Sequence, residues 1–80
     1  MIAQQIQQAQ NARAKRLAEL TEEITSLHGR IRRSCSDEAQ LERIGPESPE
    51  REAEIAVLRD ERSRLEVALF NHLKEFAELS

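Results

Sequence analysis

The chain has 80 residues, of which 34% are charged, and it contains two Phe but no Trp or Tyr. Its bulk of Ala, Glu, Leu, Arg, Gln and Ile is typical of long helices or coiled coils, and a chain of this size forms one domain at most, residues 1–80. An enzyme pocket needs concave apolar walls around converging polar groups. We therefore expect neither an enzyme nor a cofactor nor a small-molecule substrate.

Charge is unevenly distributed along the chain. Residues 1–33 carry six basic and three acidic side chains, a net +3, whereas residues 34–80 carry six basic and twelve acidic ones, a net −6. This asymmetry would favour an antiparallel arrangement of the two halves, or steer a charged partner at low salt.

A first helix is expected from about residue 2 to about residue 44. Its apolar residues fall in one narrow stripe, and from Leu17 onward they recur at alternating intervals of three and four, as in a coiled-coil seam. Leu41 and Ile44 drift off this stripe. The stripe consists of Ile2, Ile6, Ala9, Leu17, Leu20, Ile24, Leu27, Ile31 and Cys35.

An alternative is a kink or break in this helix near residues 29–36. Gly29 is a poor helix former, and Ser34 and Asp37 have the spacing of a capping box that begins a helix. The sequence supports one continuous helix better than two, without excluding the break.

A turn at residues 45–48 separates the first helix from a second, which we expect from about residue 49 to about residue 79. Gly45 suits the left-handed position that ends a helix, and Pro46 cannot continue one. Ser48 is a good N-cap, and Pro49 fits the first helical position.

The apolar stripe of the second helix meets that of the first when residue i is paired with residue 96 − i. The resulting layers include Leu41 with Ile55, Glu38 with Leu58, Ser34 with Arg62, Ile31 with Leu65, Leu27 with Leu69, Ile24 with His72, Leu20 with Phe76 and Leu17 with Leu79. The sequence therefore predicts an all-α fold, a long antiparallel helical hairpin of the coiled-coil type.

Two surfaces remain without a partner in this hairpin. Nothing opposes residues 1–15, and the C-terminal half of the second helix is apolar over a wider arc than a two-helix seam requires. We expect a homodimer, most simply a four-helix bundle, or a helical protein partner at the end distal to the turn. The layout resembles that of small helical-hairpin proteins that dimerise into four-helix bundles. The residues expected to bind the partner are Ile2, Ile6, Phe70, Leu73 and Phe76.

A second hypothesis is an accessory protein that binds nucleic acid. Arg30, Arg32 and Arg33 form a cluster of cations that could contact phosphates. The net acidic charge and the lack of an aromatic stacking platform weigh against it.

The remaining polar residues do not indicate a metal site or a membrane protein. Zinc needs about four ligands of the Cys or His type, and the chain offers three, Cys35, His28 and His72, far apart in the predicted register. No apolar run approaches the roughly 20 residues that span a bilayer. A single cysteine and the absence of a secretory signal lead us to expect a cytoplasmic protein.

Overall fold

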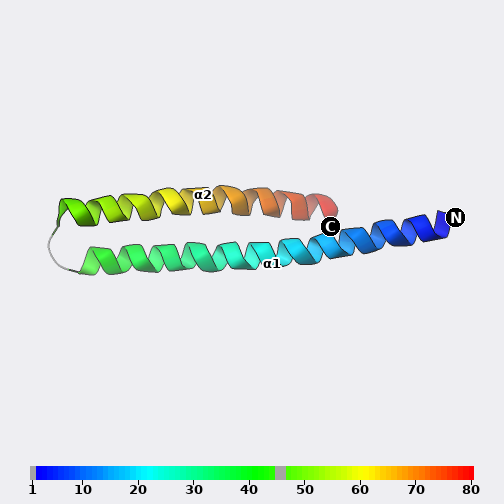
Figure 1. The fold of residues 1–80 in the computed structure, drawn as a ribbon, viewed down its shortest axis with the longest axis horizontal. Coiled ribbons are helices and arrows are strands. Elements are labelled where there is room, and N and C mark those ends of the chain that lie inside the picture. Colours follow the sequence, from blue (N-terminus) through cyan, green and yellow to red (C-terminus); the bar gives the residue numbers. More distant parts are fainter. Residues whose placement is uncertain (1, 45–46) are drawn as a thin grey trace.

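The chain folds into an all-helical hairpin (Figure 1). The computed structural model describes residues 2–44 and 47–80, in which helix α1 spans Ile2–Arg43 and helix α2 spans Pro49–Leu79. The two helices lie side by side and antiparallel, and the Cα atoms extend over 69 × 14 × 14 Å. The predicted all-α, two-helix architecture is confirmed.

Helix α1 continues without interruption through residues 29–36, so the alternative of a break there is wrong. Ser34 does not cap a helix. It lies inside α1, is 7% exposed, and its hydroxyl donates a hydrogen bond of 3.2 Å to the backbone carbonyl of Leu58 on α2. A hydroxyl that reaches the backbone of the facing helix requires a close approach of the two helices, which a small side chain permits.

The start of α2 follows the predicted capping pattern. Ser48 adopts an extended conformation, and its hydroxyl accepts a hydrogen bond of 3.1 Å from the backbone N–H of Arg51. Pro49 occupies the first helical position, and the acidic side chains of Glu50 and Glu52 lie in the first turn, where they interact favourably with the helix dipole. The predictions for Gly45 and Pro46 fall outside the described residues.

The core is the single seam between the helices. Leu20 is completely buried, and Leu27 and Ile55 are nearly so. All of the apolar residues predicted for the seam of α2 are buried or half-buried. At the neighbouring positions 34 and 35 the two predictions differ in outcome: Ser34, which the register placed in the layer with Arg62, is buried, whereas the inclusion of Cys35 in the stripe of α1 is wrong, because Cys35 is exposed.

Polar contacts between the helices fit the predicted register. The Nε2 atom of His72 lies 2.6 Å from a carboxylate oxygen of Glu23, next to the predicted partner of His72. Closer to the open end, the guanidinium of Arg16 makes hydrogen bonds of 2.6 and 2.9 Å to the two carboxylate oxygens of Glu75. This ion pair lowers the pKa of Glu75 through the hydrogen bond from Arg16. Among the described residues, it is the ion pair between the helices that lies nearest the end of α2.

The N-terminal part of α1 projects beyond the end of α2 (Figure 1). Helix α1 has 42 residues and α2 has 31, and every residue from 2 to 15 is exposed. At 1.5 Å per residue this segment, called the overhang below, is about 20 Å long.

Candidate functional site

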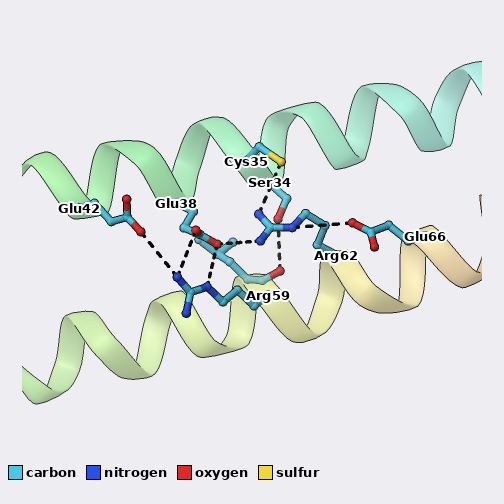
Figure 2. A network of polar contacts seen from close by, with 8 residues as sticks. Ser34, Cys35, Glu38, Glu42, Arg59, Arg62 and Glu66 are labelled. Atoms are coloured by element: carbon cyan, nitrogen blue, oxygen red, sulfur yellow. Dashed lines mark hydrogen bonds and ion pairs between the residues drawn. The ribbon is translucent and has the colours of Figure 1, made fainter.

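A cluster of charged residues joins the two helices midway along the hairpin (Figure 2). Glu38 on α1 accepts hydrogen bonds of 2.9 Å from Arg62 and 3.2 Å from Arg59, both on α2. Arg59 also lies 3.7 Å from Glu42, and Arg62 donates to the sulfur of Cys35 at 3.5 Å. The contact between Glu38 and Arg62 was expected from their adjacent layers, whereas the part of Arg59 was not.

The electrostatics of this cluster are those of a structural ion pair. Hydrogen bonds from Arg59 and then from Arg62 lower the pKa of the Glu38 carboxyl, while the bond to Glu38 raises the pKa of Arg62. The side chains of Glu38 and Arg62 are only 15% and 20% exposed. Each charge therefore has its partner, and the cluster fixes the register of the hairpin rather than offering a reactive group.

Two of the predicted partner-binding residues lie together on one side of the open end. Leu73 and Phe76 line a shallow hollow of about 230 Å³ with Thr21, Ile24 and Thr25. Phe70 is 67% exposed and lies one and a half to two helical turns before Phe76, but it does not line the hollow. We call Phe70, Leu73 and Phe76 the distal face.

Ile2 and Ile6 belong to the overhang and are 77% and 53% exposed. The overhang carries Arg13 and Lys15 and no acidic side chain. Within the described residues, neither cation forms an ion pair. The structure therefore places the overhang and the distal face at the same end of the hairpin, but on different segments.

A third apolar surface lies near the turn, and sequence reasoning missed it. Leu41, Ile44, Ala53, Val57 and Leu58 line a groove of about 570 Å³ between the helices. Ile44 and Val57 are 70% and 57% exposed. We call this the turn groove. In the sequence, this groove was indicated only by the positions of Leu41 and Ile44, which lie off the predicted seam. The sequence did not indicate that Ala53, Val57 and Leu58 of α2 would complete the groove.

The rim of the turn groove is acidic. Asp37, Gln40, Glu54 and Glu61 complete its lining, and no basic residue lines it. Within the described residues, none of the three carboxylates forms an ion pair, in contrast to Glu38 and Glu75.

The three arginines proposed for nucleic acid do not form one surface. Arg30 and Arg33 line a groove of about 400 Å³ together with Arg64, whereas Arg32 does not line it. Asp37 and Glu61 line the same groove, and Arg64 forms an ion pair of 3.0 Å with Asp60. In this groove the third arginine is therefore Arg64 and not the predicted Arg32. The carboxylates of Asp37 and Glu61 partly offset the charge of the arginines.

Among the described residues, no group of three or more His, Cys, Asp and Glu side chains is arranged to hold a metal ion. Neither α1 nor α2, as far as each is described, is long and apolar enough to cross a bilayer.

Comparison with known proteins gives no family for this chain. No family model matches it, and neither the curated proteins nor the solved structures include one that is similar to it. The class that the fold defines is a small two-helix hairpin.

Proposed function

We propose that the chain is a non-enzymatic protein–protein interaction module that associates with a second copy of itself through the open end of the hairpin. The observation that supports this most is the exposure of large apolar side chains there: Ile2, Ile6, Phe70 and Leu73 are each 45% exposed or more. Each such side chain gains about 1.5–3 kcal/mol when it is fully removed from water. A dimer, with a four-helix bundle as its simplest form, buries them and needs no other partner.

Length also supports the proposal. A helix of about four turns that has no neighbour is marginal in water. The overhang therefore gains stability from any contact that covers its apolar stripe, and a second copy brings an apolar surface of the same kind.

Sedimentation equilibrium over a wide concentration range tests this function. The wild-type chain is expected to associate, and both the double variant Ile2→Gln, Ile6→Gln and the double variant Phe70→Gln, Leu73→Gln are expected to weaken association by about tenfold or more, since each removes apolar area worth more than 1.4 kcal/mol. Ala56→Gln is the control, because Ala56 is exposed, lies far from the open end on α2 and lines none of the grooves described above. It should leave association unchanged.

A strict monomer at all concentrations, with amide protons of residues 2–12 as well protected from exchange as those of the seam, would refute this function. In that case the overhang would be stable without any partner, and its exposed side chains would need no explanation.

Nucleic-acid binding is a second candidate, favoured by the convergence of Arg30, Arg33 and Arg64 in one groove. Binding to phosphates would weaken steeply with salt. Titration of random-sequence duplex DNA and single-stranded RNA at low and high salt tests it, with Arg33→Glu as the disabling variant and Arg32→Glu as the control outside the groove. Absence of binding at low salt would exclude it.

A further inference from the structure

We propose that the overhang of one copy docks in the turn groove of the next, so that the chain associates head to tail. This inference rests on the proposed self-association and names the surface that receives the overhang. It brings the open end of one copy to the turn end of the next, a contact that the proposed function does not specify.

Charge is the first argument for this occupant. Residues 2–15 carry Arg13 and Lys15 and no acid, which gives +2. The turn groove is lined by Asp37, Glu54 and Glu61 and by no basic residue, which gives −3. Complementary charges of this kind favour the correct partner and disfavour others. Two overhangs packed against each other would instead bring two +2 segments together.

Apolar surface is the second argument. The overhang presents Ile2 and Ile6, which are 77% and 53% exposed, along the stripe that packs against α2 elsewhere in α1. The turn groove presents Ile44 and Val57, which are 70% and 57% exposed. An overhang that packs in this groove would cover Ile2 and Ile6 together with Ile44 and Val57. The three helices would then form one short layer.

Dimensions fit as well. The groove residues on α2 run from Ala53 to Glu61, and the others run from Asp37 on α1 to Ile44 just after it, so at 1.5 Å per residue the groove is about 10–12 Å long. The overhang, at about 20 Å, spans it with residues to spare.

A contact between two different surfaces is heterologous, so it does not close at a dimer. Unless the rotation between copies closes a ring, each added copy leaves one free overhang and one free groove. We expect this association to grow with concentration.

The test mixes two variants that are each defective at one end. The overhang-blocked variant carries Ile2→Gln and Ile6→Gln, and the groove-blocked variant carries Ile44→Gln and Val57→Gln. All four residues are more than half exposed, so both hairpins should fold, which circular dichroism verifies. Both variants also carry Phe70→Gln and Leu73→Gln, so that the distal face does not contribute.

Each variant alone is expected to remain monomeric in sedimentation velocity, whereas an equimolar mixture forms a one-to-one complex that does not grow further. Only a head-to-tail contact gives this result, because the mixture restores one intact overhang and one intact groove. Raising the salt concentration should weaken the complex, and Arg13→Glu with Lys15→Glu in the groove-blocked variant should weaken it by about tenfold or more.

A mixture that sediments as the sum of its two components would overturn the inference. If the wild-type chain still associates in that case, and the loss of Phe70 and Leu73 abolishes this association, self-association through the open end stands without the head-to-tail contact. If the wild-type chain does not associate at all, both proposals fail.

Discussion

Leu20 is the residue on which the stability of the hairpin depends most, because it is 0% exposed. The substitution Leu20→Ala removes three buried carbon groups, each worth about 0.8 kcal/mol, or about 2.4 kcal/mol in all. A cavity adds to this cost, but a hairpin of two helices can close around the gap or admit water to it. We therefore expect a loss of about 3 kcal/mol, toward the lower end of the range of about 2–5 kcal/mol for such changes.

This loss is large for so small a chain. At roughly 0.05–0.15 kcal/mol per residue, the free energy of unfolding of the whole hairpin is about 4–12 kcal/mol. Urea denaturation followed by circular dichroism measures the change. With a slope of about 1 kcal/mol per M, the midpoint should fall by about 3 M.

Val67→Ala provides the matched control, since it also shortens an aliphatic side chain but at a position that is 61% exposed. It should change the free energy of unfolding by no more than about 0.5 kcal/mol. If Leu20→Ala cost less than about 1 kcal/mol, or no more than Val67→Ala, the seam between α1 and α2 would not be the core and the register derived from it would be wrong.

Three further variants test other features of the hairpin by the same urea measurement. Ser48→Ala removes the N-cap of α2 and should cost about 1 kcal/mol, and no loss would mean that the bond to the N–H of Arg51 contributes nothing. Gly29→Ala should stabilise the chain by up to about 1 kcal/mol, because a Cβ there meets no atom within 4 Å, whereas a loss would contradict a continuous helix at this point. The folded-state pKa values of Glu38 and Glu75 are lowered from 4.5, so their stabilisation is complete above that pH and is lost as the pH falls through the lowered values. The double variant Glu38→Gln, Glu75→Gln should therefore flatten the acid side of the stability profile, and an unchanged profile would show that these pairs do not contribute.

The sequence was sufficient to predict the hairpin and its register, because the seam repeats at intervals of three and four and the turn is marked by residues that each have a specific role. The predicted stripe of α1 includes Cys35, whereas the predicted register pairs Ser34 with Arg62. From Leu20 the intervals run four, three, four, and the next interval of three leads from Ile31 to Ser34. The structure follows the register, because Ser34 is buried and Cys35 is exposed.

The grooves were harder to predict, because each is lined by residues of both helices. A residue joins a groove only if it lies on the same side of the seam as the groove residues of the facing helix. Ile44 and Val57 line the same groove only because the two helices pair with a particular rotation about their axes. The same holds for Arg64, which joins Arg30 and Arg33 although it lies far from them in the sequence. Residues 30–33 form a cluster in the sequence but not on the surface of the helix. Neighbours in sequence point about 100° apart on a helix, whereas residues three apart share a side.

The difference in length between the helices connects these observations. Had α1 and α2 been equal in length, the seam would cover the whole apolar stripe of α1, and only the turn groove and the distal face would present apolar surfaces to water. Instead the 42 residues of α1 exceed the 31 of α2, and the excess lies entirely at the open end. The turn end has an apolar groove with an acidic rim, and the excess segment is a polar helix with two cations and a narrow apolar stripe, long enough to span the groove. A single chain cannot bring its own two ends together, because α1 is a continuous helix and holds them about 60 Å apart. A second copy can supply the contact that a single chain cannot make with itself, and the mixing of two half-defective variants, rather than any single substitution, tests this proposal.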